Sequence, residues 1–173
     1  MISDSVKRLV GAAGLMVTVV VTGVGCATSD QYEDDEGTKP VRLQEAKEKT
    51  LAVEREIADA FAVDDVVSVE QLHEGVLLSC TDDQYQWTGR LQIELLPRVE
   101  GHVALGTVEG VFRDRDGYTF QTRKAQGLTA LIVSGPSGEA FVGDYDAETH
   151  LLNVASASIC VTLEGDESPL GTY

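Results

Sequence analysis

Three histidines and one turn serine are the residues of this sequence that most often carry acid–base or nucleophilic chemistry. His73, His102 and His150 are widely separated, and none is paired at the spacing that a zinc or catalytic site uses. We expect each to be a surface histidine. Ser137 stands in the sequence Gly-Pro-Ser-Gly, which lacks the Gly-x-Ser-x-Gly spacing of a nucleophile elbow, so we expect a turn serine there.

Carboxylates gather at Asp144, Asp146 and Glu148, where they could hold Ca²⁺ or serve as the acid and base of a small hydrolase. A calcium loop needs a turn glycine and a distal glutamate, whereas Thr149 and His150 follow here. The sequence also contains no phosphate loop, dinucleotide fingerprint or Cys-x-x-Cys pair. We therefore expect no metal, no cofactor and no enzymatic activity, and we keep the carboxylate hydrolase as the alternative.

Four aromatic residues could instead serve a binding site, because aromatic rings provide contact area at a small entropic cost. They are Tyr85, Trp87, Tyr118 and Tyr145. Tyr85 and Trp87 fall on the apolar phase of an alternating segment, so packing in the core is the expected role.

The segment from Lys7 to Cys26 has the layout of an export signal. Two basic residues precede an uncharged run of about sixteen residues, Leu9 to Val24, which is shorter than the ~20 residues of a membrane-spanning helix. The last residues, Gly23-Val24-Gly25-Cys26, resemble the lipobox of bacterial lipoproteins, in which cleavage exposes a cysteine that receives lipid. Gly23 replaces the usual leucine, so an ordinary signal peptidase site or an uncleaved anchor remains the alternative.

The number of cysteines supports lipidation of Cys26. Three cysteines are an awkward number for an oxidising compartment, but acylation of Cys26 leaves Cys80 and Cys160 to form a disulfide. That bond closes a loop of roughly 80 residues and would restrict the unfolded chain by about 4 kcal/mol in the chain-entropy model. Because its two cysteines are so far apart in sequence, we expect a structural role for the bond rather than a redox role.

The chain has 173 residues and a formal net charge of −16. Removal of residues 1–25 would leave 148 residues, enough for one domain with a continuous core. So acidic a chain opposes binding to nucleic-acid phosphates and to anionic lipid headgroups. We expect a neutral, cationic or metal-bridged partner, either an envelope protein or a small ligand, and no nucleic acid.

Four segments are expected along the chain. A signal peptide occupies residues 1–25, and the lipidated Cys26 begins a disordered acidic tether that extends to residue 40. A single α+β domain occupies residues 41–163, and a polar, flexible tail occupies residues 164–173.

Two helices are predicted in the domain. Pro40 suits a first helical turn, and steps of three and four then connect apolar or small residues at Leu43, Ala46, Thr50, Val53, Ile57 and Phe61. The charged residues of this helix, Glu54 among them, are expected on its other faces. A weaker helix is predicted for residues 99–116, although its three glycines each cost roughly 1 kcal/mol relative to alanine.

Residues 85–95 alternate between apolar and polar side chains and predict the clearest strand, with one face buried and one exposed. Further strands are predicted for residues 66–69, 76–78, 118–123, 128–134, 140–145 and 150–161. This order of elements predicts a two-layer α+β sandwich, in which two helices pack on one face of five or six mostly antiparallel strands.

Several features occur in a fixed order along the chain: Cys26 with its acidic tether, Cys80 ahead of Trp87, Gly117-Tyr118 after the second helix, and Cys160. This layout resembles that of small uncharacterised lipoproteins of actinobacteria, of the mycobacterial LppA-like type. The likeness spans most of the chain after the signal. It implies a two-layer α+β fold with one disulfide and no assigned activity, and it carries over no functional residue.

These observations predict a lipoprotein on the outer face of the cytoplasmic membrane that acts as a non-enzymatic interaction module of the cell envelope. A secreted form is the alternative to the lipid anchor. The alternative functions are a small envelope hydrolase, which would need two or more carboxylates such as Asp144 and Asp146 to converge with a histidine in one pocket, and an exported inhibitor or immunity protein.

Overall fold

The computed structural model describes residues 41–125 and 128–173. The predicted signal peptide, Cys26 and the acidic tether lie outside the described residues. The helices are α1 (Leu43–Asp59) and α2 (Gly101–Phe112), and a short 3-10 helix is η1 (Val63–Asp65). The strands are β1 (Val66–Leu72), β2 (Leu77–Ser79), β3 (Gln84–Leu95), β4 (Thr119–Ala125), β5 (Leu128–Ser134), β6 (Ala140–Asp146), β7 (Leu151–Ala157) and β8 (Val161–Thr162).

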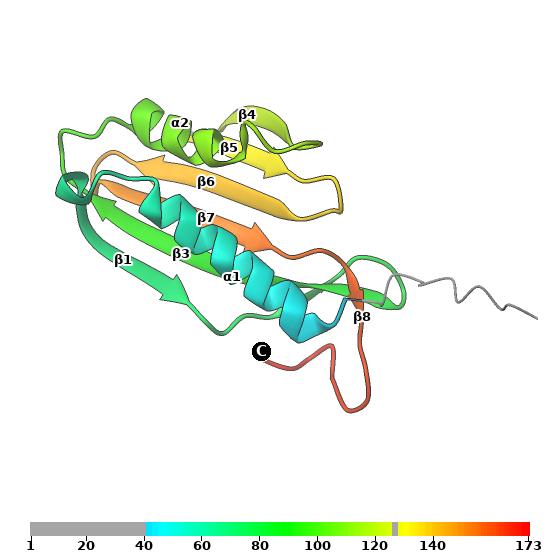
Figure 1. Cartoon of the computed structure of the whole chain (residues 1–173). Helices are drawn as coiled ribbons and strands as arrows, with labels where there is room; N and C mark the ends of the chain where they lie inside the picture. The colour runs from blue at the N-terminus through cyan, green and yellow to red at the C-terminus, as the bar shows by residue number, and fades with distance from the viewer. Residues whose placement is uncertain (1–40, 126–127) are drawn as a thin grey trace, which may run out of the picture. The chain divides into compact units, whose positions relative to one another are not determined.

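The strands form one antiparallel sheet with both helices on one face (Figure 1). The main order across the sheet is β1-β3-β7-β6-β5-β4, and the short strands β2 and β8 both pair with β3. Helix α1 packs over β3 and β7, while α2 packs over β5 and β6. The predicted two-layer α+β sandwich is confirmed, with two short strands added to the six of the main order.

Alternation along β3 places one set of side chains under the helices. Trp87, Leu91 and Ile93 are buried, whereas Arg90 and Glu94 are exposed on the other face. Two groups of buried apolar residues result. The first lies beneath α2 and the C-terminal half of α1, and the second surrounds Trp87 beneath the N-terminal half of α1.

The buried stripe of α1 differs from the predicted one at a charged position. Glu54, expected on a solvent face, is 0% exposed, whereas Val53 is only partly buried. The steps from Thr50 to Glu54 to Ile57 fit the helical period as well as the steps through Val53 do. Choosing between the two neighbours by hydrophobicity therefore gave the wrong residue.

Helix α2 forms in spite of its glycines, over residues 101–112 rather than the predicted 99–116. Its buried residues, Ala104, Val108 and Phe112, are four positions apart and form one stripe. Gly106 and Gly110 lie off this stripe, where an added Cβ would meet nothing within 4 Å. The glycines therefore weaken the helix without serving its packing.

Replacing Gly106 or Gly110 by alanine is expected to raise the free energy of unfolding by about 0.5–1 kcal/mol each, because alanine loses less backbone entropy in a helix. Urea unfolding of each variant measures this gain. Gly101→Ala is the matched control, because its Cβ would lie 2.7 Å from the Tyr145 ring, and it should lose stability. Equal effects at all three positions would contradict the placement of α2.

The single strand predicted for residues 150–161 is wrong, because a bulge divides it. Ala157 pairs with Thr88 and Val161 pairs with Tyr85, so three residues on this strand oppose two on β3. An extra residue reverses which side chains point to the core. The even-numbered residues of β7 are buried, but in β8 the odd-numbered Val161 is. Ser158 Oγ accepts a hydrogen bond from the backbone N–H of Trp87 at 2.9 Å, and this bond replaces one of the backbone hydrogen bonds that the bulge interrupts between the two strands.

The segment 164–173, expected to be a flexible tail, instead returns to the sheet. Thr172 bridges to Val76, and the N–H groups of Gly75 and Tyr173 each donate to the other's carbonyl, at 2.8 and 3.0 Å. The indole N–H of Trp87 donates to the Tyr173 carbonyl at 3.1 Å. A buried indole needs an acceptor, and the returning segment supplies it.

Candidate binding surface

We call the face of the sheet opposite the helices the open face. The pairing register of the strands arranges the side chains of this face in rows that run across the sheet. One row crosses Leu72, Arg90, Ala155, Val142, Ile132 and Gln121. The neighbouring row crosses Thr88, Ala157, Ala140, Ser134 and Thr119. The middle of the two rows is an apolar centre made of Ile132, Ala140, Val142, Ala155 and Ala157.

Four members of the apolar centre line a shallow hollow of about 330 Å³. Small alanine side chains leave room above the strands, and Leu78 and Arg90 stand at the sides of the hollow. Leu78 is 50% exposed, and Leu72, the cross-strand neighbour of Arg90, is 41% exposed. In the described part of the chain, Arg90 makes no ion pair.

Polar side chains border the apolar centre in the next rows. Gln92 Nε2 donates to Asn153 Oδ1 at 2.7 Å, and Asn153 Nδ2 donates to Asp144 Oδ2 at 3.2 Å. This ladder orients one side chain on each of three adjacent strands. The border is largely negative, since it carries four carboxylates, Glu70, Glu94, Asp144 and Asp146, with Arg123 at the far edge strand.

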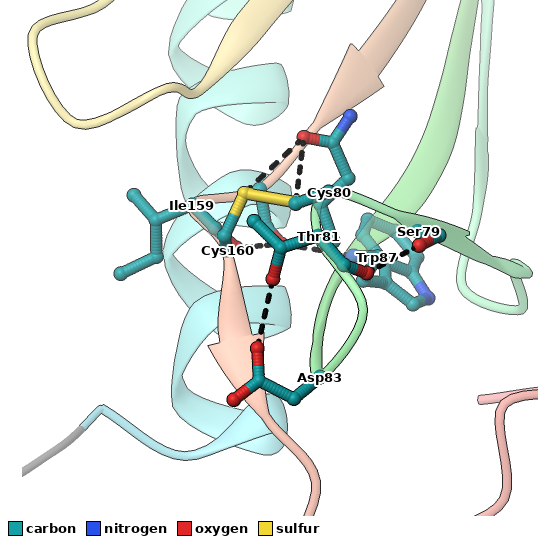
Figure 2. The surroundings of a disulfide bond; sticks show 9 residues. Ser79, Cys80, Thr81, Asp83, Trp87, Ile159 and Cys160 are labelled. Atoms are coloured by element: carbon teal, nitrogen blue, oxygen red, sulfur yellow. Dashed lines mark hydrogen bonds between the residues drawn. A yellow bond between two sulfur atoms is a disulfide. The ribbon is translucent and has the colours of Figure 1, made fainter.

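The predicted pair Cys80 and Cys160 lies at the bulged end of the sheet (Figure 2). Their sulfur atoms are bonded in the structure, and their Cα atoms are 6.3 Å apart. The bond connects the residue after β2 to the residue before β8. Gln86 Oε1 lies 3.6 and 3.9 Å from the two sulfur atoms, a polar contact because a disulfide has no S–H to donate.

The three histidines lie in separate surroundings. His73 and His102 are exposed, and His102 Nδ1 lies 3.2 Å from a Glu100 carboxylate oxygen. His150 Nδ1 lies 3.2 Å from the Tyr145 hydroxyl, which donates to the Val99 carbonyl at 2.8 Å. The structure therefore places His150 on the helix side of the hairpin between β6 and β7.

Two of the three predicted carboxylates, Asp144 and Asp146, accept hydrogen bonds within the hairpin of β6 and β7. Asp144 accepts the Asn153 amide on the open face, and Glu148 is exposed. Asp146 Oδ1 accepts the backbone N–H groups of Glu148 and Thr149 at 2.8 and 3.4 Å, and these bonds hold the pKa of Asp146 below its ordinary value. Within residues 41–125 and 128–173, no three His, Cys, Asp or Glu side chains are grouped to hold a metal ion.

The aromatic residues and the serine that were considered for binding or catalysis lie in the core or in a turn. Trp87 is 0% exposed and Tyr145 is 8% exposed, and both pack in the core as expected. Tyr85 and Tyr118 are partly buried against the two groups of core residues. Ser137 lies in the turn between β5 and β6, where its N–H donates to a Glu139 carboxylate oxygen at 3.1 Å.

Glu54 is the buried group that sequence reasoning missed. Gln71 Nε2 donates to its Oε2 at 2.8 Å, and Ser156 Oγ donates to its Oε1. Burial raises the pKa of Glu54, and the hydrogen bonds from Ser156 and Gln71 only partly oppose this. Gly89 leaves space for the carboxyl, because a Cβ there would lie 2.7 Å from Oε1. The helical period of α1, which Glu54 fits as well as Val53 does, was the signal in the sequence that could have indicated the burial of Glu54.

Among the helices of residues 41–125 and 128–173, none has the length and apolar character needed to cross a membrane. No protein-family model, curated protein or solved structure matches the chain.

Proposed function

We propose that this chain is an exported, lipid-anchored, non-enzymatic interaction module of the cell envelope, which holds a protein partner on its open face. One observation carries the proposal: an apolar centre with a hollow lies on the sheet face that the two helices leave uncovered, and carboxylates border it. Exposed apolar patches with a polar border are typical of sites where proteins associate.

The size of the open face suits a modest interface. Six strands about 4.8 Å apart and seven residues long at about 3.4 Å each give a footprint of roughly 700 Å². This is close to the ~800 Å² per partner of a standard interface and below the ~1,000 Å² or more per partner of obligate interfaces. We therefore expect a reversible partner rather than an obligate subunit.

Charge specifies the partner further. The chain has a net charge of −16, and the border of the apolar centre carries Glu70, Glu94, Asp144 and Asp146. An acidic surface at that point would repel most acidic proteins, including a second copy of this chain. The partner that fits best is an envelope protein with an apolar patch bordered by lysine or arginine.

The cellular location rests on the cysteines. A long-range disulfide between Cys80 and Cys160 suits an oxidising compartment, and a leader before Cys26 accounts for export to one. Intact-mass measurement of protein extracted from membranes should find cleavage before Cys26, an acylated cysteine and two cysteines without free thiols. A full-length chain inside the cell with three titratable thiols would contradict the location, and a cleaved chain without lipid would favour the secreted form.

Photo-crosslinking in intact cells that produce the protein tests the partner. A photoreactive residue in place of Val142, on the open face, should give one stoichiometric adduct. The same residue in place of Val103, which is 49% exposed on α2, should not. Ala155→Arg places a long cation in the hollow and should reduce the adduct at least about tenfold, the equivalent of ~1.4 kcal/mol.

Ala62→Arg is the matched control, because Ala62 is exposed outside the sheet and its variant should keep the adduct. Equal adducts from Val142 and Val103, or none from either, would contradict the proposal. An adduct with a second copy of the chain would assign the open face to self-association. Loss of the partner's own enzymatic activity in the complex would identify the inhibitor or immunity role.

A further inference from the structure

A second concavity lies on the helix side of the sheet, between α1 and the segment that follows α2. It has a volume of about 150 Å³, and Lys49, Val53, Tyr118, Glu139, Phe141 and Ile159 line it. Lys49 and Val53 belong to α1, Phe141 to β6, and Tyr118 and Glu139 to the ends of the connections before β4 and β6. We call it the inter-helix pocket.

Apolar side chains form the body of the inter-helix pocket. Phe141 is 1% exposed and belongs to the first core group, and Val53 and Ile159 are partly buried. An apolar cavity of about 150 Å³ has room for a single ring such as benzene. The pocket therefore selects a ligand body of one ring or a short branched chain.

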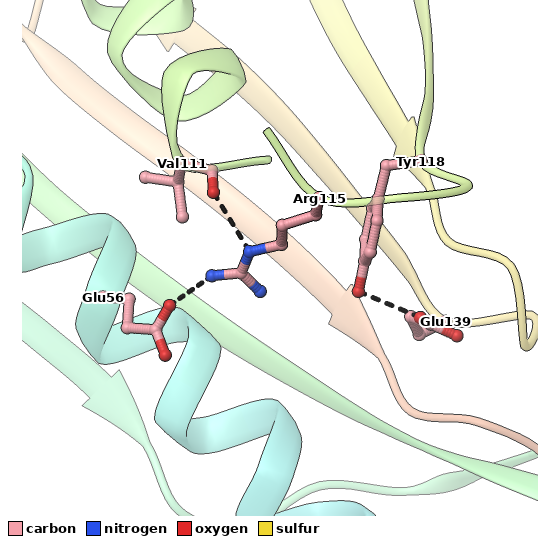
Figure 3. A network of polar contacts seen from close by, with 5 residues as sticks. All are labelled: Glu56, Val111, Arg115, Tyr118 and Glu139. Carbon is pink, nitrogen blue, oxygen red and sulfur yellow. Dashed lines mark hydrogen bonds and ion pairs between the residues drawn. The ribbon is translucent and has the colours of Figure 1, made fainter. Parts of the chain in front are cut away.

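Glu139 provides a carboxylate in a fixed position at the pocket (Figure 3). The Tyr118 hydroxyl donates to its Oε1 at 2.9 Å, and the N–H of Ser137 donates to its Oε2 at 3.1 Å. Gly135 makes room for it, because a Cβ there would lie 2.3 Å from the Glu139 carboxyl carbon. A carboxylate has about four lone-pair sites, so Glu139 can accept further hydrogen bonds.

Arg115 holds the wall that contains Tyr118 against α1 (Figure 3). Its guanidinium donates to Glu56 of α1 and, at 3.1 Å, to the Val111 carbonyl of α2. The same guanidinium lies 5.0 Å from the Phe112 ring centre and 6.0 Å from that of Tyr118. The positive charge of Arg115 is thus paired with Glu56.

We propose that the inter-helix pocket binds a compact apolar primary amine, with the ammonium on Glu139 and the ring or branched chain against Phe141. Lys49 does not make it an anion site, because its ammonium is already 2.8 Å from Glu45 and its side chain is 63% exposed. The net charge of −16 also attracts cations rather than anions. Binding of the amine is independent of a partner on the open face.

Three probes of similar size separate the contribution of the ammonium group from that of the ring: benzylamine, benzyl alcohol and benzoate. Two-dimensional NMR of the isotope-labelled full chain should show saturable shifts with benzylamine, centred on Val53, Tyr118 and Phe141. Benzyl alcohol should bind about tenfold more weakly, because it lacks the charge-assisted hydrogen bond to Glu139. Benzoate should not bind.

Variants locate the site. Val53→Phe fills the pocket and should abolish the shifts, whereas Val63→Phe, at a site 87% exposed outside the pocket, should not. Glu139→Gln keeps the shape and should weaken benzylamine about tenfold. Lys49→Met should leave the affinity unchanged or raise it. Absence of saturable shifts, equal binding in Val53→Phe, or benzoate binding that disappears in Lys49→Met would each overturn the proposal.

Discussion

Replacement of both Cys80 and Cys160 by serine is expected to lower the free energy of unfolding by about 4 kcal/mol, because the loop of 80 residues that the bond closes is then unrestricted in the unfolded chain. The folded state also depends on this bond. Strand β8 has only two paired residues on β3, and it brings Val161 into the core group around Trp87. Urea unfolding followed by Trp87 fluorescence measures the loss.

Wild-type protein unfolded under reducing conditions is the matched control and should show the same stability as the double serine variant. A loss of less than about 1 kcal/mol in both would mean that the bond adds little to folding and would remove the structural argument for an oxidising compartment. A large loss in the variant but not on reduction would assign the effect to the serine side chains, which replace partly buried sulfur.

The second large change in the free energy of unfolding is expected when the surroundings of the buried Glu54 are altered. Ser156→Ala removes the hydroxyl that donates to Glu54 Oε1 and should cost about 2 kcal/mol, because the carboxyl is left with one fewer donor in the core. The loss should decrease as the pH falls toward 4.5, because a protonated carboxyl needs that donor less. Ser134→Ala, an exposed strand serine, is the matched control and should change stability by under about 0.5 kcal/mol.

The pH dependence of Glu54 has a definite sign. Its pKa is raised above the ordinary value of 4.5, chiefly by burial, so the folded state keeps a proton that the unfolded chain has lost. The stability that Glu54 contributes is therefore complete below pH 4.5 and is lost as the pH rises through the folded-state pKa. His73, beyond β1, and Arg55, on α1, act electrostatically to lower the pKa of Glu54, but the effect of burial is larger.

Glu54→Gln isolates this effect, because the amide keeps the shape of the side chain and does not titrate. The gain in stability of the variant over the wild type should grow as the pH rises above 4.5, in urea unfolding from about pH 4 to 8. Asp146, whose pKa is lowered, acts in the opposite direction, but it is common to both proteins and cancels in the difference. A difference that stays constant would show that folding does not shift the pKa of Glu54, and one that shrinks as the pH rises would show that folding lowers it.

The layers of the fold follow from periodicity that is visible in the sequence. Residues 85–95 alternate strictly, so β3 has one buried and one exposed face whatever it pairs with. Steps of three and four placed Leu43, Ala46 and Ile57 on the buried stripe of α1. The elements and their order were sufficient to predict two helices on one face of an antiparallel sheet, because each element must bury its apolar side.

Other features depend on contacts between distant residues. Glu54 and Val53 fit the helical period equally well, and only Ser156, Gln71 and the space at Gly89 decide that the carboxyl is buried. The bulge after Ala157 shows only as a shift in pairing with β3. No local pattern reports such a shift, because periodicity describes one strand and a bulge is a relation between two.

The sequence by itself therefore determined most of the helices and strands, the two layers, and which two cysteines could pair with each other. Only the tertiary structure decided which surfaces and pockets exist. The apolar centre combines residues of β5, β6 and β7, and the inter-helix pocket combines α1, β6 and the segment after α2. Strand register and helix placement bring these side chains together, and both are set by packing over distances that no periodic signal spans.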